Sequence, residues 1–523
     1  MIVALSVVAS SLAATAQMQY RNPIIAGYHP DPSICRVGND YYLVNSSFQY
    51  FPGVPIYHSR DLVNWELIGN VLNRESQLPL KGASSWLGIY APTIRYNDGI
   101  FYMITTNVGN GGNFMVTATD PRGPWSEPIW LSQQGIDPSL YFEQGKCYMV
   151  SNPDNTIMLC QIDPTTGRQL TTSKPLWQGT GGRYPEGPHI YKKDGWYYLL
   201  ISEGGTELAH RLTMARSRSI EGPYEACPDN PLLTHCSLAG QNSQIQGTGH
   251  GDLTDTPDGR WWMVLLAYRN YGGSYHHIGR ETFLAPVEWK KGEWPVVNGG
   301  QPIDTLMTVA NVPTPVNYIP QQAKRHIHTT FDKPLGHEWV YIQNPNMACY
   351  NSIDGLLRLT ASAATLRDNL KPTFVGRRQE SANFTATTFV DFFESMTGDE
   401  AGLTVYQIND GHADFCLSPD AMGSRLMLKV HLKGLDTVKR STELPLCRCH
   451  LRVRSDGTMY YFEYSTDGKK FRLLDKLDCS LLSTEVVGGF TGAMIGMYAT
   501  TTPRNAVTGP SYADFSYFDY QED

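Results

Sequence analysis

The chain has 523 residues, of which 42 are Lys or Arg and 50 are Asp or Glu, so its formal net charge is −8 at pH 7. This acidic balance argues against a nucleic-acid binder, which would carry a basic patch or stripe. Hydrophobic residues make up 41% of the chain and charged residues only 18%, which excludes a disordered chain and provides ample material for a core.

The first element is a short apolar run over residues 2–16, which ends in Ala14-Thr15-Ala16. Such a run with small residues at its end is typical of a signal peptide and its cleavage site. It is too short to span a bilayer, and no other stretch is long and apolar enough to do so. We therefore expect residues 1–16 to be a signal peptide and the protein to be secreted or periplasmic. No Lys or Arg precedes the run, so the true start of the chain stays open.

From about residue 20 a repeated pattern follows: Pro-x-Ile or Pro-x-Leu, a turn rich in Gly, Asn and Asp, and then paired bulky residues. Its five units begin at Pro32, Pro92, Pro138, Pro188 and, with Gly in place of Pro, at Gly251. Each unit is typical of a β-hairpin, and a spacing of roughly 50 residues matches a propeller blade. We predict an all-β protein in which residues 20–310 form a five-bladed β-propeller, with a sandwich or an irregular β fold as the alternative.

The repeat stops near Gly300. Residues 311–325 carry three prolines and are predicted to be a linker. Short alternating apolar runs return from residue 326 to 523, as in residues 425–431, without a useful helical period. We predict a second domain over 326–523 that is a two-sheet β-sandwich.

Acidic residues stand at the start of the repeat units. Asp31 and Asp137 directly precede the first Pro of their units, and Glu186 lies two residues before it. His250 precedes Gly251, and Tyr90 takes this place in the second unit. Equivalent positions of different blades lie at similar depth around one axis, so these side chains would meet in one pocket. The alternative is that they are only turn formers.

Three carboxylates in one pocket suit glycoside hydrolysis. An inverting enzyme needs one carboxylate to activate water and one carboxylic acid to protonate the leaving oxygen, with room for the water between them. A third carboxylate near the acid would raise its pKa by like-charge repulsion.

These residues and their neighbours resemble glycoside hydrolase family 43. The likeness covers about residues 20–523. In the propeller half it is carried by His29-Pro30-Asp31-Pro32-Ser33, Tyr90-Ala91-Pro92, Ile136-Asp137-Pro138, Tyr184-Pro185-Glu186-Gly187-Pro188, Thr248-Gly249-His250 and Gly279-Arg280-Glu281. Gly376-Arg377-Arg378-Gln379 and Gly489-Phe490-Thr491-Gly492 resemble the concanavalin-like sandwich appended in the family's xylosidase-like members.

The resemblance implies a role for each polar residue. Asp31 matches the general base, Glu186 the general acid, and Asp137 the carboxylate that orients the acid and tunes its pKa. Arg280 matches an Arg that hydrogen-bonds the sugar. His250 matches a His beneath the sugar, which in some members is a ligand of a water-coordinated calcium ion. The resemblance therefore implies no cofactor for the chemistry, and a possible structural calcium in the channel.

The resemblance also implies an aromatic first subsite. Phe48 and Tyr90 match aromatic positions that line it, and Phe490 matches a residue that the sandwich pushes into the pocket mouth. The pocket would then be closed at one end and remove terminal sugars. The family's xylosidase-like members often carry Trp where Tyr90 stands and Asn where His29 stands, which leaves the identity of the sugar open.

We expect an inverting, exo-acting α-L-arabinofuranosidase that acts on arabinose- or xylose-containing glycans of plant cell walls. The residues around Tyr90 look nearer to arabinofuranosidase members, and a β-xylosidase or a dual activity is the alternative. An endo-arabinanase and a non-catalytic sugar-binding propeller are further alternatives. Neither a nucleic acid nor a membrane is an expected partner.

Four more polar residues are ambiguous in the sequence. His276 and His277 precede Arg280 and could reach the pocket, but we expect a surface loop. Glu203 and Glu207 could line the mouth, but we expect a solvated turn.

Overall fold

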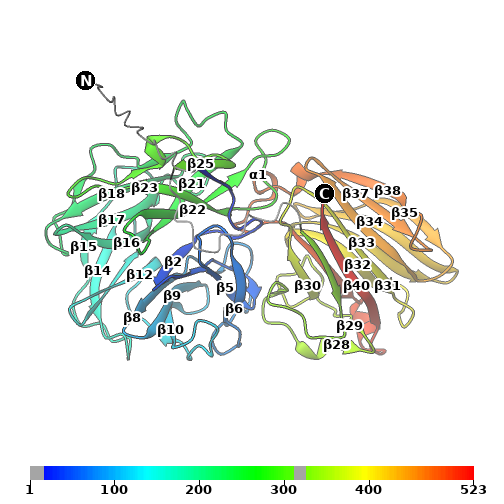
Figure 1. Ribbon diagram of the computed structural model, residues 1–523. Coiled ribbons are helices and arrows are strands. Elements are labelled where there is room, and N and C mark those ends of the chain that lie inside the picture. Colours follow the sequence, from blue (N-terminus) through cyan, green and yellow to red (C-terminus); the bar gives the residue numbers. More distant parts are fainter. Residues whose placement is uncertain (1–16, 311–324) are drawn as a thin grey trace, which may run out of the picture.

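The computed structural model describes residues 17–310 and 325–523. The expected signal peptide, 1–16, and all of the expected linker except residue 325 lie outside the described residues. The described chain is all-β apart from two helices of four residues and three short 3-10 turns. It forms two β-rich halves that lie side by side (Figure 1).

The first half contains five antiparallel sheets of four or five strands, each built from strands that lie near one another in the sequence. Sheet one is β2 (Ser33–Val37), β3 (Asp40–Val44), β5 (Gly53–Ser59) and β6 (Glu66–Leu72). Sheet two is β7 (Gly88–Ile89), β8 (Thr93–Asn97), β9 (Ile100–Val108), β10 (Gly112–Ala118) and β11 (Ile129–Trp130). Sheet three is β12 (Ile136–Glu143), β13 (Lys146–Asn152), β14 (Ile157–Ile162) and β15 (Lys174–Trp177).

Sheet four is β16 (Glu186–Lys193), β17 (Trp196–Glu203), β18 (Arg211–Ser217), β19 (Glu225–Ala226) and β20 (Leu233–Thr234). Sheet five is β21 (Ile245–Asp255), β22 (Trp261–Arg269), β23 (Glu281–Glu288) and β24 (Val296–Val297). Strand β1 (Gln17–Arg21) pairs with β25 (Leu306–Ala310), the strand that follows sheet five. The ends of this half of the chain are thereby joined.

One long strand near the start of each sheet faces its counterparts in the neighbouring sheets. Strand β2 contacts β8, β8 contacts β12, β12 contacts β16, β16 contacts β21, and β21 contacts β2 again. The predicted hairpins are present, because each of these five strands pairs with the strand that follows it. The five strands therefore follow one another in a closed order.

An irregularity at the start of these strands directs the site residues. The pairing register breaks near the beginning of β12, β16 and β21, and such bulges re-aim side chains. The residues that occupy equivalent positions there have a positive φ: Asp31 (52°), Asp137 (51°), Gly187 (57°) and His250 (45°). This left-handed conformation is unusual for residues other than Gly, although Asp tolerates it better than most.

Further along the same strands, a buried ion pair joins the sheets. Asp252 is fully buried and accepts bonds from both terminal nitrogens of Arg95, at 2.8 and 3.1 Å. It also accepts bonds from the Tyr191 hydroxyl at 2.6 Å and the Ser33 hydroxyl at 2.7 Å. These four residues, which we call the Asp252 network, come from four different sheets. Burial would raise the pKa of Asp252, but Arg95 and the hydrogen bonds outweigh it and lower that pKa.

The second half is a sandwich of two antiparallel sheets. One comprises β26 (His326–Thr330), β28 (Tyr350–Ile353), β29 (Leu356–Thr360), β31 (Asn383–Asp391), β36 (Arg448–Asp456), β37 (Met459–Ser465), β38 (Arg472–Asp478) and β40 (Tyr512–Glu522). The other comprises β30 (Thr373–Arg378), β32 (Glu400–Ile408), β33 (Gly411–Asp420), β34 (Gly423–Leu432), β35 (Leu435–Leu444) and β39 (Met494–Thr500). Apolar side chains that alternate along the strands fill the space between the sheets.

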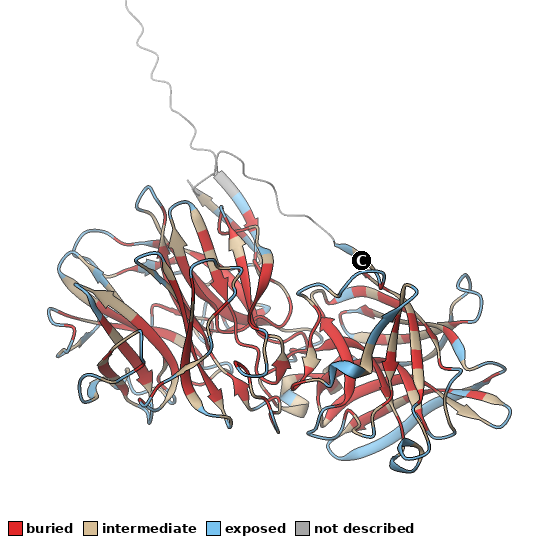
Figure 2. Ribbon diagram, turned by 90° about the horizontal axis from the view of Figure 1, so that it is seen from below, coloured by how far each residue is buried: buried red, intermediate tan, exposed pale blue. Residues whose placement is uncertain are grey.

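The two halves pack tightly against each other. A short strand of the first half, β4 (Tyr50–Phe51), pairs with β27 (Tyr341–Ile342) of the second. Buried aromatic residues of both halves form one apolar cluster, in which Tyr28 and Tyr50 pack near Tyr406. Buried residues accordingly fill both interiors and continue towards the contact between them (Figure 2). Helix α1 (Thr484–Val487) of the second half lies beside the first, whereas α2 (Pro503–Ala506) follows β39. Within the described residues, no helix is long and apolar enough to cross a bilayer.

Candidate active site

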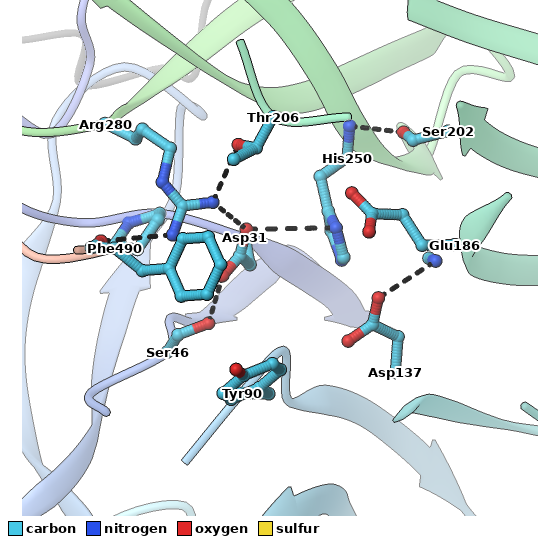
Figure 3. Close-up of polar contacts among 12 residues, drawn as sticks. Asp31, Ser46, Tyr90, Asp137, Glu186, Ser202, Thr206, His250, Arg280 and Phe490 are labelled. Atoms are coloured by element: carbon cyan, nitrogen blue, oxygen red, sulfur yellow. Dashed lines mark hydrogen bonds and ion pairs between the residues drawn. The ribbon is translucent and has the colours of Figure 1, made fainter. Parts of the chain in front are cut away.

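A cavity of about 400 Å³ opens where the five strands begin. It is lined by all eight residues that the sequence suggested for the site: Asp31, Phe48, Tyr90, Asp137, Glu186, His250, Arg280 and Phe490. Seven come from the first half, and Phe490 comes from the sandwich. Figure 3 shows how the side chains of seven of them, all except Phe48, converge.

Asp31 is held in its charged form. It is 5% exposed, and its carboxylate accepts bonds from Arg280 at 3.1 Å and from the Ser46 hydroxyl. The His250 ring lies 3.8 Å from the same carboxylate. Burial would raise the pKa of Asp31, but Arg280, His250 and Ser46 together lower it below its ordinary value. Asp31 is therefore a carboxylate at neutral pH.

Asp137 and Glu186 form an acidic pair on the side of His250 away from Asp31 (Figure 3). Burial and the neighbouring charges of Glu186 and Asp31 raise the pKa of Asp137 well above its ordinary value. Asp137 also accepts a bond of 3.2 Å from the N–H of Gly187, the residue after Glu186. Asp137 therefore holds a proton to a higher pH than a free carboxyl does.

Glu186 is more open than the other two acids. Its side chain is 19% exposed, and its carboxylate lies 3.4 Å from Nε2 of the buried His210. The next residue is Gly187. A side chain would not fit there, because a Cβ would come within 3.0 Å of the His250 ring. Asp31 and Asp137 occupy equivalent positions at the start of sheets one and three. In sheet four the equivalent position is Gly187, and the acid, Glu186, stands one residue earlier.

Arg280 connects Asp31 to the sandwich. Its guanidinium donates to Asp31, to the Thr206 hydroxyl at 3.0 Å, and to the backbone carbonyl of Phe490 at 3.2 Å. It also lies over the rings of Phe48 and Phe490, at 5.7 and 5.6 Å from their centroids. The sandwich therefore contributes both a ring and a backbone acceptor to this site.

Aromatic rings surround the pocket opposite the acids. Phe490 packs against Phe48 at 5.6 Å, Tyr90 at 5.9 Å and Trp86 at 4.8 Å between ring centroids. The Tyr90 hydroxyl donates to the Trp86 carbonyl at 2.6 Å, and burial raises the pKa of Tyr90 to about 12. Tyr90 is thus a neutral wall of the site.

Two sequence-based expectations are wrong. His276 and His277 do not lie on a surface loop: they are 7% and 0% exposed, and His276 bonds Glu485 of the sandwich. Glu203 does not lie on a solvated turn, because it is fully buried and forms an ion pair with Arg211 at 3.1 Å. Glu207 is exposed and lines the cavity mouth.

Several site residues escaped the sequence-based search. Ser46, His210 and Thr206 each bond or contact a charged group of the site, and Trp86 and Tyr184 line the cavity. They lie in connecting segments outside the five-fold repeat. Tyr184 stands in one of the motifs that carry the family resemblance, but no role followed for it from the sequence.

The structure offers few ligands for the expected calcium ion. Within residues 17–310 and 325–523, no three His, Cys, Asp or Glu side chains are grouped so that they could hold a metal. Calcium prefers several oxygen ligands; the His250 ring lies 3.8 Å from the Asp31 carboxylate, and a water-coordinated calcium ion at His250 stays a prediction. The side chains present do not form a calcium cage, so no chemical step is assigned to a metal here.

Two family matches agree with this geometry. Residues 20–295 match the glycosyl hydrolases family 43, and residues 328–521 match the beta xylosidase C-terminal concanavalin A-like domain. The chain belongs to glycosyl hydrolase family 43. It is therefore a glycoside hydrolase, as the resemblance implied.

Relatives in this family resemble the chain over nearly its whole length. A Bacteroides ovatus protein named non-reducing end alpha-L-arabinofuranosidase BoGH43B is 42% identical, over 97% of this chain and 95% of its own. A xylosidase/arabinosidase of Butyrivibrio fibrisolvens is 39% identical, over 96% and 99%. The solved structure titled Bacteroides ovatus Xyloglucan PUL GH43B has a TM-score of 0.90 at 40% identity, covering 97% of this chain and all of its own.

Proposed function

We propose that this family 43 enzyme is an exo-acting, inverting α-L-arabinofuranosidase, which removes terminal arabinofuranosyl residues from plant cell-wall glycans. The observation that carries the proposal is one cavity that holds three carboxyls: Asp31, whose pKa is lowered, and Glu186 beside Asp137, whose pKa is raised. The Bacteroides ovatus relative, named as acting at non-reducing ends on α-L-arabinofuranosides, supports the choice of sugar.

The proposed reaction is a single displacement. Asp31 takes a proton from a water molecule while the water oxygen attacks the anomeric carbon. Glu186 gives its proton to the glycosidic oxygen, and the bond between that oxygen and the anomeric carbon breaks. The attack comes from the face opposite the leaving group, so the configuration inverts. The two groups stand on different sides of His250 (Figure 3), which suits this division.

The neighbours of the two acids prepare them for these roles. Arg280 and Ser46 keep Asp31 ionised and fix its orientation, so that it is ready to accept a proton. Asp137 accepts a bond from the Gly187 N–H and thereby fixes the backbone next to Glu186. Burial and repulsion by Glu186 and Asp31 raise the pKa of Asp137, so a proton is retained next to Glu186, where general acid catalysis requires one.

We further propose that the five sheets are the blades of a closed five-bladed β-propeller. The closed order of contacts from β2 to β21 and back supports this, as does the β1–β25 pairing. The strand starts would then surround one end of a central channel. Because Phe490 and Arg280 cover part of this end, the pocket suits a terminal sugar better than the middle of a polymer.

A β-xylosidase or dual activity is the second candidate. The Butyrivibrio fibrisolvens relative carries both activities in its name, and a Bacillus subtilis relative, 32% identical, is named beta-xylosidase. Secretion and a calcium ion bound near His250 through water stay predictions.

The experiment that tests the proposal is a paired rate assay on an aryl α-L-arabinofuranoside and an aryl β-D-xyloside, with NMR detection of the first-formed anomer. The arabinoside should be cleaved faster, with inversion, and Asp31→Ala should abolish cleavage. Faster xyloside cleavage would favour the second candidate. Binding without cleavage would indicate a sugar-binding protein, and a rapid fall in arabinan viscosity would indicate an endo enzyme.

A further inference from the structure

Two segments from different halves of the molecule meet next to the active site. Residues 276–280 of the first half precede β23 and end in Arg280. Residues 484–493 of the sandwich begin with α1, contain Phe490 and precede β39; we call them the Phe490 loop. The two segments thus carry the guanidinium that binds Asp31 and the aromatic ring that lies beside it.

The Phe490 loop is bonded to the first half at both of its ends. At its start, the N–H of Thr484 donates to the His276 carbonyl at 3.1 Å. At its end, the N–H of Ala493 donates to the His277 carbonyl at 2.9 Å. Because both acceptors belong to the neighbouring segment of the first half, these two bonds fix the loop against that segment.

Two glycines let the segments approach closely. A Cβ on Gly492 would lie 2.0 Å from the Ile278 carbonyl oxygen, and a Cβ on Gly279 would lie 2.8 Å from the Cα of Gly492. Gly279 also has a φ of 98°, in the left-handed region that favours glycine. The backbones are therefore in direct contact, with no room for a side chain between them.

One side-chain contact fastens the start of the loop. Glu485 accepts a bond from the His276 backbone N–H at 3.0 Å, and its other carboxylate oxygen bonds Nδ1 of the same residue. Burial would raise the pKa of Glu485, but the contacts with His276 outweigh burial and lower that pKa, so Glu485 is ionised at neutral pH. The His276 ring stacks on the buried Tyr268, with the ring centroids 3.9 Å apart. The stack fixes the direction of the bond to Glu485.

The residues of this contact act on the site from outside it. Phe490 and Arg280 line the catalytic cavity, whereas His276 and Glu485 do not. Arg280 donates to the backbone carbonyl of Phe490 at 3.2 Å. A shift of the Phe490 loop would therefore move a ring of the cavity wall and also withdraw an acceptor from the residue that binds Asp31. Small misplacements of groups that hold a substrate are costly to its binding and turnover.

We propose that Glu485 and His276 are positioning residues, which fix the Phe490 loop against Arg280 and thereby set the affinity for the terminal sugar. This inference rests on the proposed function, because the terminal sugar is the one that would occupy the cavity beside Phe490 and Arg280. The two positioning residues take no part in proton transfer, so they affect KM more than kcat.

The test uses variants on both sides of the contact. Glu485→Ala removes both acceptors, whereas Glu485→Gln keeps one oxygen acceptor and the length of the side chain. His276→Phe keeps a ring that can stack on Tyr268 and removes the ring nitrogen. Asp40→Ala is the matched control, because Asp40 bonds the His58 ring at 2.7 Å where β3 begins and does not line the cavity.

We measure kcat and KM on an aryl α-L-arabinofuranoside. KM should rise about tenfold in Glu485→Ala and about threefold in His276→Phe, with kcat within about threefold of the wild-type value. Glu485→Gln should recover most of the loss, and Asp40→Ala should behave as the wild type does. A fall in kcat with unchanged KM, or wild-type kinetics in both Glu485→Ala and His276→Phe, would overturn the proposal.

A double-mutant cycle separates positioning from general support of the fold. In the Phe490→Ala background the ring to be positioned is absent, so adding Glu485→Ala should raise KM by a further factor of about three or less. Two tenfold losses that multiply would show that Glu485 acts independently of Phe490 and would overturn the proposal. A wild type that cleaves no aryl glycoside would instead overturn the proposed function.

Discussion

The candidate active site and the Asp252 network lie on the same strands but differ in burial and in how their charges are paired. Strand β16 carries Glu186 at the active site and Tyr191 in the Asp252 network, and β21 carries His250 and Asp252 in the same way. In the network the carboxylate of Asp252 is fully buried and completely bonded. At the site the acids face a cavity and repel one another.

This difference indicates how one set of strands serves both stability and chemistry. The partners of the buried Asp252 carboxylate lower its pKa and join it to neighbouring sheets. Removing one partner of such a buried pair lowers the free energy of unfolding substantially. A carboxylate with a raised pKa is less stable as an ion but can carry a proton for catalysis. The positive φ values at Asp31, Asp137 and His250 mark the boundary between the two regions.

The largest expected effect comes from Glu186→Gln. The variant cannot protonate the leaving oxygen, so its kcat on arabino-oligosaccharides should fall by about 10³-fold. An aryl glycoside with an acidic leaving group should lose much less, because that group departs without a proton. Steady-state rates on the two substrates measure this. Equal losses on both would contradict the role of Glu186 as the acid.

Asp137→Asn should change the pH dependence. In the wild type, the lowered pKa of Asp31 keeps the base ionised well into acid, and the raised pKa of Asp137 extends proton retention towards higher pH. Removing the Asp137 charge should move the basic limb of the kcat/KM profile to lower pH by about one unit. The acidic limb should hardly move. A shift of the basic limb to higher pH would contradict the repulsion between the Asp137 and Glu186 carboxyls.

Phe490→Ala should weaken sugar binding without disabling the acids. The ring packs on Phe48, Tyr90 and Trp86 but bonds no carboxylate. We expect KM for the aryl arabinoside to rise about tenfold, with a smaller change in kcat. Phe393→Ala, at a sandwich residue that is 85% exposed and does not line the catalytic cavity, is the control. A loss confined to kcat would argue against a binding role.

The smallest effect is expected from Tyr191→Phe. The substitution removes one bond to Asp252 and one acceptor of the Leu253 N–H. The free energy of unfolding should fall by about 1–2 kcal/mol in urea titrations, and kcat/KM should stay within a factor of two or so. A large loss of activity would mean that the network also shapes the site.

The repeat made most of the catalytic cluster predictable. Asp31, Asp137 and His250 occupy equivalent positions in three hairpins of the repeat, and these equivalent positions lie close together in space. Ser46, Thr206 and His210 follow no repeat, and contacts made by connecting segments depend on packing. Glu203 and His276 were misjudged because a polar residue near a turn is usually solvated, and only the three-dimensional contacts with Arg211 and Glu485 bury them.

The Asp252 network could not be predicted for a related reason. Asp252 stands in the one unit where Gly replaces the first Pro, and the sequence does not show that Arg95 from another sheet reaches it.

The most direct test of this division compares Asp31→Asn with Asp252→Asn, measuring kcat/KM and the free energy of unfolding of each. Asp31→Asn should lose about 10³-fold in rate and cost about 1 kcal/mol of stability or less, because Arg280 keeps its bonds to Thr206 and the Phe490 carbonyl. Asp252→Asn should lower the free energy of unfolding by about 3 kcal/mol. Its folded fraction should keep most of the wild-type kcat/KM. A folded Asp252→Asn without activity, or an active Asp31→Asn, would contradict the account.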